Sequence, residues 1–379
     1  MPEDLSLSEE VRYARHLTLP EVGEKGQKKL RKSSILVIGA GGLGSPALLY
    51  LAAAGVGKIG IIDDDRVDIT NLQRQVIHAT AKIGELKVNS ASSRIKELNP
   101  EVEVITHNLR LDFSNALELL TGWDVVIDGT DNFPTRYTIS DACEILSIPW
   151  VFGSIHRFEG QVSVFNYQKG PNYRDLFPTT PSSDLAPNCA ESGVLGVLPG
   201  IVGSIQATEA LKIILEFGKP ISGKLLTIDA KTMEMRSLSF SKDENRSPIT
   251  EMSKELIMRS CNSNEGDNQH GILEITPENF MQRKKSGWKP FLLDVRRADE
   301  ERIATIDGTD HRIMHMEVPA KLEEIPKQGD IVVYCRTGVR SAAVSKFLLE
   351  SGLYSGKIFN LSGGIHLWSD QIDPSLVKY

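Results

Sequence analysis

The stretch I-L-V-I-G-A-G-G-L-G, from Ile35 to Gly44, decides the fold of this chain. Its first four residues are apolar and mostly β-branched, which is typical of a buried strand. Gly39, Gly41 and Gly44 follow in the spacing G-x-G-x-x-G, which lets the phosphates of a nucleotide approach backbone N–H groups at the start of a helix. Since several classes of nucleotide-dependent enzyme share this turn, it predicts a type of ligand and no particular reaction.

The composition is that of an ordinary globular protein with room for two domains. The chain has 379 residues, of which 40% are hydrophobic and 25% charged. Its formal net charge of -7 leads us to expect neither a nucleic-acid partner nor a membrane partner. The first 32 residues lack the apolar core of a signal peptide, and no apolar run is long enough to span a bilayer. We therefore expect a cytoplasmic protein.

Strand and helix patterns alternate after the glycine turn. The sequence predicts a helix over 45–54, a strand over 58–63, a helix over 80–98 and strands over 102–107 and 124–129. This alternation predicts a mainly parallel, doubly wound sheet that binds ligands at the carboxyl ends of its strands. Asp63 lies about twenty residues after the glycines, where a carboxylate accepts hydrogen bonds from a ribose. A solvated D-D-D turn is the alternative.

The middle of the chain changes character. The sequence predicts two strands over 150–166, an irregular loop over 170–187, a helix over 198–217 and strands over 224–239. Residues 241–271 are polar and rich in Asn and Ser, with one short helix expected over 251–259. We interpret them as a linker between a first domain, 1–240, and a second, 272–379.

A cysteine at a strand-to-helix turn marks the second domain. Strands are expected over 292–295 and 330–334, and the latter runs directly into C-R-T-G-V-R-S, which a helix over 342–349 follows. Cys335 would then lie among backbone N–H groups at the positive end of a helix, close in sequence to Arg336 and Arg340. These features favour a thiolate and would stabilise an anionic persulfide. A buried structural cysteine is the alternative.

Two known families share these motifs. The stretches G-A-G-G-L-G-S, D-D-D-R-V-D-I-T-N-L-Q-R-Q, G-T-D-N-F-P-T-R-Y and G-S-I-Q-A-T-E-A-L-K resemble the MoeB/ThiF family, adenylyltransferases that activate ubiquitin-like sulfur carrier proteins. Residues 272–379, with L-L-D-V-R, C-R-T-G-V-R-S and L-S-G-G-I-H-L-W, resemble a rhodanese domain. The fusion is similar to MoeZ-like adenylyltransferase/sulfurtransferases. The resemblance implies a Rossmann-like ATP-binding domain of the ubiquitin-activating type, with an antiparallel extension of its parallel sheet, and a small α/β rhodanese domain.

The resemblance also implies the residues of an adenylation site. Asp131 corresponds to the acid that organises Mg²⁺, and Arg15 to an arginine that the partner subunit of a homodimer contributes. Arg74 and Lys87 correspond to cations that offset charge as ATP is cleaved. The residues implied to bind ATP are Gly39, Gly41, Gly42, Gly44, Asp63, Asp65, Asn71, Arg74, Lys87, Asp131 and Asn132.

Two cysteines carry implied roles in sulfur transfer. Cys335 would hold the persulfide, and Cys189, in A-P-N-C-A-E-S-G-V, matches a thiol that attacks the acyl adenylate or joins the sulfur relay. The persulfide loop comprises Arg336, Thr337, Gly338, Val339, Arg340 and Ser341. A sulfur donor such as thiosulfate or a cysteine desulfurase is expected.

The chain departs from the MoeB/ThiF family at a metal site. Most relatives bind a structural zinc through two C-x-x-C pairs, the first near a P-x-Y-R-like stretch. Here that stretch reads P-N-Y-R-D, with Asn172 and Asp175 at the cysteine positions, and residues 241–248 contain no cysteine. We therefore predict no zinc.

The sequence thus predicts an enzyme that adenylates the C-terminal Gly-Gly carboxylate of a sulfur carrier of the MoaD/ThiS type and converts it to a thiocarboxylate. In the alternative, the acyl adenylate is used without sulfur and the rhodanese domain serves only for docking. A nicotinamide-dependent dehydrogenase shares the glycine turn, but the sequence offers no acid/base set for hydride transfer. A non-catalytic scaffold conflicts with the density of phosphate-binding residues.

Overall fold

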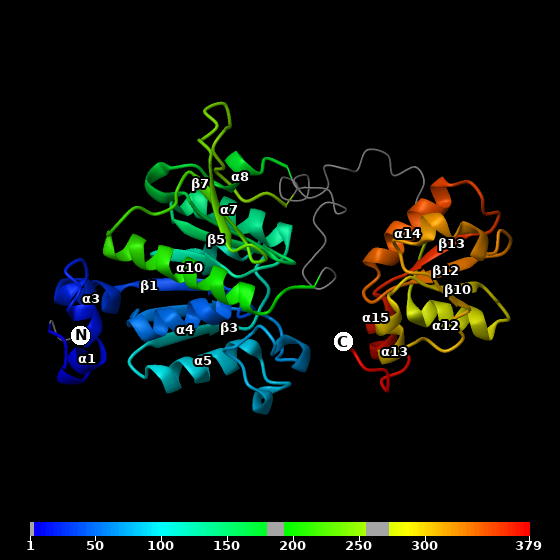
Figure 1. Ribbon diagram of the computed structural model, residues 1–379, viewed down its shortest axis with the longest axis horizontal. Coiled ribbons are helices and arrows are strands. Elements are labelled where there is room, and N and C mark those ends of the chain that lie inside the picture. The colour runs from blue at the N-terminus through cyan, green and yellow to red at the C-terminus, as the bar shows by residue number, and fades with distance from the viewer. Residues whose placement is uncertain (1–3, 180–192, 255–272) are drawn as a thin grey trace. The chain divides into compact units, whose positions relative to one another are not determined.

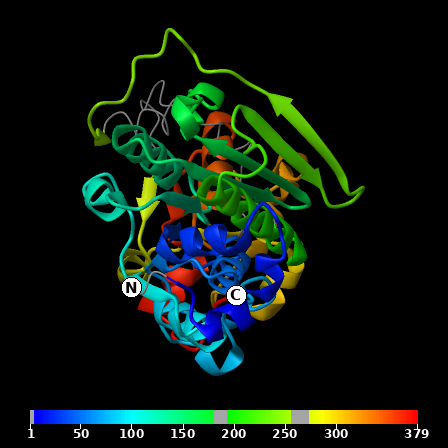
Figure 2. The same ribbon diagram turned by 90° about the vertical axis from the view of Figure 1, so that its left-hand side faces the viewer.

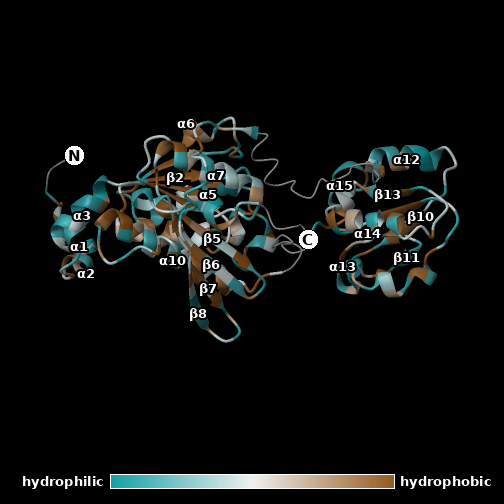
Figure 3. Cartoon of the chain, turned by 90° about the horizontal axis from the view of Figure 1, so that it is seen from above, coloured by the Kyte–Doolittle hydropathy of each residue, from teal (hydrophilic) through white to brown (hydrophobic). Residues whose placement is uncertain are grey.

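The protein consists of two compact units, Met1–Glu265 and Gly266–Tyr379 (Figure 1). The computed structural model describes residues 4–179, 193–254 and 273–379. Most of the predicted linker and of the helix expected over 251–259 lies outside the described residues. Figure 3 shows that the central strands of both units are largely hydrophobic, whereas helices such as α3 (Gly23–Lys32) and α12 (Pro277–Lys285) are mainly hydrophilic.

The first unit is built on one eight-stranded sheet in the order β3-β2-β1-β4-β5-β6-β7-β8. The first five strands in this order run parallel, and β6, β7 and β8 add an antiparallel extension at one edge (Figure 2). The strands are β1 (Ser34–Ile38), β2 (Lys58–Ile62), β3 (Glu103–His107), β4 (Val125–Asp128), β5 (Trp150–His156), β6 (Glu159–Phe165), β7 (Lys224–Asp229) and β8 (Glu234–Ser239).

Helices cover both faces of the parallel part, because side chains alternate along each strand. Ile35 and Val37 of β1 pack in one apolar core with α4, α5 and α10, whereas Leu36 and Ile38 pack in a second core with α6 and α7. The remaining helices described in this unit, α1, α2, α3 and α8, are short or lie near its N-terminus. The helices other than α3 have the bounds α1 (Leu7–Arg12), α2 (Ala14–Leu17), α4 (Gly44–Ala54), α5 (Lys87–Leu98), α6 (Ala116–Leu120), α7 (Phe133–Leu146), α8 (Tyr173–Leu176) and α10 (Val197–Leu215).

Helix α10 is long and apolar enough to cross a membrane by composition, yet it is a core helix. It packs against α4, β5 and β6. Its buried Gln206 donates hydrogen bonds from Nε2 to the carbonyl oxygens of Asp128, at 2.7 Å, and Val151, at 3.2 Å. The helix therefore helps to fix the ends of the central strands.

The second unit contains a five-stranded parallel sheet in the order β11-β10-β12-β13-β9. Helices α12 and α15 contribute to the core on one face, and α14 contributes to the core on the other. Its further elements are β9 (Leu273–Ile275), β10 (Phe291–Asp294), α13 (Ala298–Ile303), β11 (His311–Arg312), β12 (Ile331–Tyr334), α14 (Val339–Glu350), β13 (Ile358–Leu361) and α15 (Gly364–Gln371). The predicted fold, a mainly parallel sheet with an antiparallel extension plus a small α/β domain, is confirmed.

Two local predictions were wrong. The helix expected over 80–98 begins only at Lys87, because Gly84 adopts a φ of +86° and residues Thr80–Lys82 form a separate 3-10 turn. The loop expected over 170–187 is described only as far as residue 179, and this part contains the short helix α8, which begins with a capping box formed by Asn172 and Asp175. A glycine with a positive φ sets the first of these helix boundaries and capping side chains set the second, and apolar periodicity reports neither effect.

Candidate functional sites

A pocket of about 330 Å³ lies where the strand order reverses, at the carboxyl ends of β1, β2 and β4. In a doubly wound sheet this edge is where the connecting loops separate and leave a crevice. Of the residues predicted to bind a nucleotide, the pocket is lined by Gly39, Gly41, Gly42, Asp63, Asp65, Arg74, Lys87, Asp131 and Asn132. The lining does not include Gly44, Asn71 or Arg15.

Two of the glycines in the turn, Gly39 and Gly44, are required for different structural reasons. Gly39 adopts a φ of +95°, and a Cβ there would lie 2.8 Å from the carbonyl oxygen of Gly129. Gly44 opens α4, and its Cβ would lie 1.9 Å from the Gly39 carbonyl oxygen, so this glycine allows close packing. Between them, Gly41, Gly42 and Leu43 line the pocket, and their backbone N–H groups have no hydrogen-bond partner within the described parts of the chain. Three such donors in succession suit an anionic ligand.

Asp63 holds the glycine turn as well as lining the pocket. Its Oδ2 accepts a hydrogen bond from the Ala40 N–H at 2.8 Å, and its Oδ1 accepts one from the Asp65 N–H at 2.9 Å. Burial raises the pKa of Asp63, while the charge of Lys87 opposes that change. Each carboxylate oxygen retains a further lone pair, so Asp63 is able to accept a hydrogen bond from a ribose hydroxyl.

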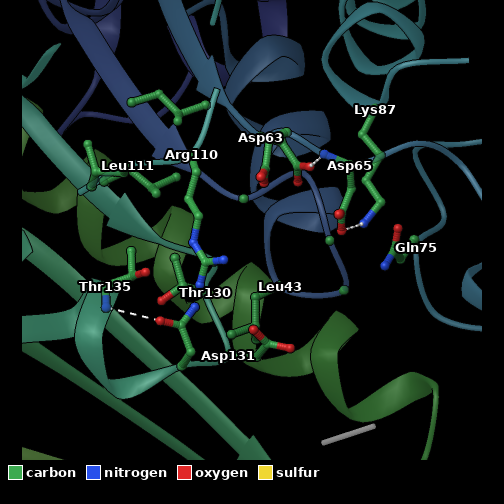
Figure 4. A pocket seen from close by; sticks show the side chains of 18 of the residues that line it. Leu43, Asp63, Asp65, Gln75, Lys87, Arg110, Leu111, Thr130, Asp131 and Thr135 are labelled. Atoms are coloured by element: carbon green, nitrogen blue, oxygen red, sulfur yellow. Dashed lines mark hydrogen bonds and ion pairs between the residues drawn. The ribbon is translucent and has the colours of Figure 1, made fainter. Parts of the chain in front are cut away.

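Cations reach the pocket from two segments after β2. Lys87, at the start of α5, is buried, and its Nζ donates to Asp65 at 2.8 Å (Figure 4). Arg74 follows the 3-10 turn η1 (Ile69–Asn71), and its Nη1 donates to the Thr70 carbonyl at 3.1 Å. Asn71 lies in η1 itself and does not reach the pocket wall. Both cations line the pocket, so their charges would attract a polyanion to it.

The opposite wall is the loop after β4. Asp131 is exposed, and its carboxylate has no hydrogen-bond partner among the residues that the structure describes. Asn132 instead uses its side chain as the N-cap of α7, where Oδ1 accepts from the Thr135 N–H at 3.0 Å. An exposed carboxylate oxygen is the type of ligand that Mg²⁺ prefers, so Asp131 fits the metal role predicted for it. Asp63, Asp64 and Asp65, whose carboxylate oxygens lie within 4.8 Å of one another, form a second group of suitable ligands.

Two arginines in this pocket escaped the sequence prediction. Arg110 follows β3, is exposed, and extends toward the loop that carries Thr130 and Asp131 (Figure 4). Arg136 is buried in α7, where its Nη2 donates to the Thr130 carbonyl at 2.9 Å and its Nε lies 3.6 Å from the carboxylate of buried Asp128. Arg136 belongs to the quoted motif G-T-D-N-F-P-T-R-Y, which was a usable signal. Arg110 lies in a stretch without any motif.

In the second unit, Cys335 lies at the carboxyl end of β12 and is fully buried. Its Sγ accepts hydrogen bonds from the Gly338 N–H at 3.1 Å and from the Ser341 hydroxyl at 3.4 Å. Gly338 has a φ of +95°, which lets the loop turn back over the sulfur before α14 begins. The predicted loop thus directs two hydrogen-bond donors at the sulfur, and donors of this kind favour the charged form of a thiol.

An ion pair ties the persulfide loop to α13. Both terminal nitrogens of Arg340 donate to the Glu300 carboxylate, at 2.7 and 2.8 Å. Although burial acts to raise it, hydrogen bonds from Arg340 and from the Arg297 backbone lower the pKa of Glu300 to about 2. The loop also receives backbone support from the L-S-G-G-I-H stretch, because the N–H groups of Ile365 and His366 donate to the carbonyls of Cys335 and Arg336.

The other predicted residues lie elsewhere. Arg15 is exposed on α2 and lies outside the pocket of its own chain. Cys189 lies outside the described residues. Cys143 is buried in α7, and burial raises the pKa of its thiol well above the usual value, which suits a packing role.

Hydrogen bonds and ion pairs connect the residues that stand at the zinc-ligand positions of the relatives. The Asp175 carboxylate accepts from the Asn172 N–H at 2.7 Å and from Arg246 Nε at 2.9 Å. Arg246 also donates twice to Glu144 of α7, at 3.1 Å each. Arg246 therefore fastens the segment after β8 to α7 and α8. The prediction of no zinc stays a prediction.

Comparisons with known proteins identify the family of each unit. The ThiF family model matches residues 13–249, and the rhodanese-like domain model matches residues 276–371. A Mycobacterium tuberculosis protein named as a probable adenylyltransferase/sulfurtransferase MoeZ is 43% identical over 99% of this chain and 96% of its own length. A Thermus thermophilus sulfur carrier protein adenylyltransferase is 48% identical over 63% of this chain and 89% of its own length.

A solved structure shares the fold of the first unit. The structure of E. coli MccB with ATP is similar with a TM-score of 0.56 and 20% identity, over 62% of this chain and 74% of that chain. At this identity the likeness concerns the fold alone. From the family matches and the full-length relative, the chain belongs to the ThiF family and is an adenylyltransferase and sulfurtransferase, with a rhodanese-like domain after the ThiF domain.

Proposed function

We propose that this enzyme adenylates the C-terminal Gly-Gly carboxylate of a ubiquitin-like sulfur carrier protein of the MoaD/ThiS type and then converts it to a thiocarboxylate. One observation carries the proposal. A single chain joins a pocket with three successive unpaired N–H donors and nearby cations to a loop that encloses a cysteine sulfur. The first feature suits a triphosphate and the second suits a persulfide.

The first step is adenylation at the pocket of the first unit. The glycine turn would bind the phosphates of ATP, and Asp63 would accept hydrogen bonds from the ribose. A carrier carboxylate oxygen attacks the α-phosphorus, the bond to the β-phosphate breaks, and pyrophosphate leaves. Arg74 and Lys87 offset the charge that develops on the leaving group. Mg²⁺, held by Asp131, would supply further neutralisation of that charge.

The second step transfers sulfur. The outer sulfur of a Cys335 persulfide attacks the carbonyl carbon of the acyl adenylate, and AMP leaves, which gives an acyl disulfide. A thiol then attacks Sγ of Cys335 and releases the thiocarboxylate; that thiol is oxidised to a disulfide with Cys335, which a thiol reductant must reduce. Cys189 is the candidate in this chain. Thiosulfate or a cysteine desulfurase would restore the persulfide.

Further parts of the proposal follow from the family. We infer a cytoplasmic homodimer in which Arg15 serves the pocket of the partner subunit, since it lies outside the pocket of its own chain. The alternative, in which the second unit only docks the carrier, gives no role to the hydrogen bonds that Sγ of Cys335 accepts.

The proposal is tested by ATP–pyrophosphate exchange with purified full-length enzyme and candidate Gly-Gly carriers, added one at a time. The cognate carrier should stimulate exchange, and a carrier lacking the last two glycines should not. Exchange without any subsequent thiocarboxylate would favour the docking alternative. Absence of both nucleotide binding and exchange with every carrier would contradict the proposed adenylation.

A further inference from the structure

A buried histidine contacts the glycine turn without lining the pocket. His78 lies between η1 and α5, and its Nε2 is 3.0 Å from the carbonyl oxygen of Ala40. Its Nδ1 is 2.9 Å from the hydroxyl oxygen of Ser90 in α5. Both side chains are buried, and neither belongs to the site predicted from the sequence.

The hydrogen-bond partners of His78 define which ring nitrogen carries the hydrogen atom. A carbonyl oxygen only accepts hydrogen bonds, so Nε2 must carry the hydrogen and donate it to Ala40. In a neutral imidazole Nδ1 is then an acceptor, and Ser90 donates its hydroxyl hydrogen to it. Burial lowers the pKa of His78 from its ordinary value of 6.5; the hydrogen bond to the Ala40 carbonyl and the charge of Glu85 oppose this effect, and the charge of Lys87 adds to it. The imidazole is therefore neutral near pH 7.

The contact at Ala40 controls the direction of the next N–H group. A trans peptide is planar, and its C=O and N–H bonds point in opposite directions. Because His78 holds the Ala40 carbonyl inside the protein, the N–H of Gly41 points away from His78. Gly41 lines the pocket, and its N–H has no partner in the described structure. On the other side of the same residue, the Ala40 N–H is held by Asp63 at 2.8 Å.

We propose that His78, oriented by Ser90, is a positioning residue that fixes the Ala40–Gly41 peptide so that the Gly41 N–H is presented to a phosphate of the nucleotide. The identity of that ligand rests on the proposed function. The hydrogen bond from His78 is needed because glycine at position 41 permits either sign of φ. Without this hydrogen bond the Ala40–Gly41 peptide would rotate easily. A donor that is already oriented binds an anion without the cost of ordering the loop.

Two substitutions at position 78 separate positioning from packing. In His78→Gln the side-chain amide is able to donate from nearly the same place, whereas His78→Leu keeps an apolar side chain without any donor. Titration calorimetry of the full chain with ATP, and separately with pyrophosphate, measures phosphate binding without catalysis. We expect His78→Leu to weaken the affinity for both ligands about tenfold and His78→Gln to restore it to within about threefold of the wild type.

Ser90→Ala provides a second measurement if His78→Leu does not fold. It frees Nδ1 and should weaken the affinity for ATP about threefold. The matched control is Ser163→Ala, which removes a buried hydroxyl whose partner is the Lys224 carbonyl at 2.8 Å, away from the pocket. This control should leave the affinity unchanged.

The possible results are distinct. Unchanged affinity in both His78→Leu and Ser90→Ala would overturn the inference, as would a fall only in the number of binding sites or in thermal stability. A wild type that binds pyrophosphate and ATP but shows no carrier-dependent exchange would contradict the proposed function, while the effect of His78 on phosphate binding would still decide the inference. A wild type that binds neither ligand would contradict both.

Discussion

In the first unit the groups that face the ligand are left open, whereas in the second unit the loop around Cys335 is already occupied by internal contacts. The N–H groups of Gly41 and Gly42 and the Asp131 carboxylate have no partner in the described structure. By contrast, Arg340 is engaged twice by Glu300, and Cys335 is fully buried between Gly338 and Ser341. An open site suits a large polyanion that binds and leaves. A loop with its internal contacts already made suits the sulfur of Cys335, which stays in the protein.

The comparison is tested most strongly by removing the sulfur. Cys335→Ala should reduce thiosulfate:cyanide sulfur transfer to the uncatalysed rate, because no other described residue offers a thiol in this loop. Carrier-dependent ATP–pyrophosphate exchange should be unchanged. Cys143→Ala, which removes a buried packing thiol, is the control. Loss of both activities in Cys335→Ala would contradict two separate sites.

The reverse experiment addresses the open site. Asp131→Ala should lower carrier-dependent ATP–pyrophosphate exchange by about a hundredfold or more, because it removes the exposed carboxylate that would hold Mg²⁺ beside the phosphates. Sulfur transfer from thiosulfate to cyanide in the same preparation is the internal control and should be unchanged. An exchange rate within about twofold of the wild-type rate, a difference too small for a residue that stabilises the transition state, would exclude Asp131 from the metal-binding role.

A smaller effect is expected from loosening the closed site. Glu300→Gln leaves Arg340 without its carboxylate, so the loop loses its orientation and sulfur transfer should fall about tenfold. The matched control is Glu301→Gln, whose partner Arg312 is half-exposed. A variant as active as the wild type would show that the loop needs no external anchor.

The same carboxylate predicts a pH dependence. The pKa of Glu300 is about 2 in the folded protein, below its ordinary value of 4.5. Its contribution to stability is therefore fully present above pH 4.5 and is lost as the pH falls from 4.5 toward 2. The protection of residues 273–379 against hydrogen exchange, corrected for the intrinsic exchange rate at each pH and followed by mass spectrometry, should fall across this window in the wild type. In Glu300→Gln it should change less, and an equal change in both would assign the effect to other groups.

The smallest effect on activity is expected at Arg246, which lies in neither site. Arg246→Met breaks its ion pairs with Asp175 and Glu144 and should lower the free energy of unfolding by about 2 kcal/mol in urea. Arg236→Met, which breaks an exposed pair with Glu234, should cost less than about 0.5 kcal/mol. Equal costs would mean that the Arg246 cluster is ordinary surface charge.

A chelator separates this cluster from a zinc site. If the ion pairs of Arg246, and no zinc ion, stabilise this region, treatment with a zinc chelator should leave the midpoint of urea unfolding of the wild type unchanged. Metal analysis of the purified protein should find no stoichiometric zinc. Stoichiometric zinc would overturn the prediction made from Asn172 and Asp175.

The fold could be predicted because its signals are local and repeated. The glycine turn, the buried strands and the C-R-T-G-V-R-S loop each report the shape of one short segment. Gly44 and Asn71 were expected to bind the nucleotide, and this stays a prediction; in the structure Gly44 allows close packing and Asn71 lies in η1 outside the pocket lining. One glycine pattern thus contains pocket-lining and packing positions that its spacing alone does not separate.

The parts that escaped prediction depend on contacts between distant segments. Arg110 reaches the pocket only because β3 ends beside β2, and no motif marks it. His78 meets Ala40 across 38 positions of sequence. The interruption at Gly84 depends on a backbone angle rather than on apolar periodicity. Sequence reasoning thus named residues that the fold brings to the pocket, and it missed residues that are placed in or beside the pocket by contacts between distant segments.

The most direct test of the whole account is mass spectrometry of the cognate carrier after incubation with full-length enzyme, ATP, Mg²⁺, thiosulfate and a thiol reductant. The account predicts that one oxygen of the terminal carboxylate is replaced by sulfur, and that Cys335→Ala yields only the acyl adenylate or its hydrolysis product. Formation of the thiocarboxylate by Cys335→Ala at the wild-type rate, or its absence with the wild type despite rapid adenylation, would contradict it.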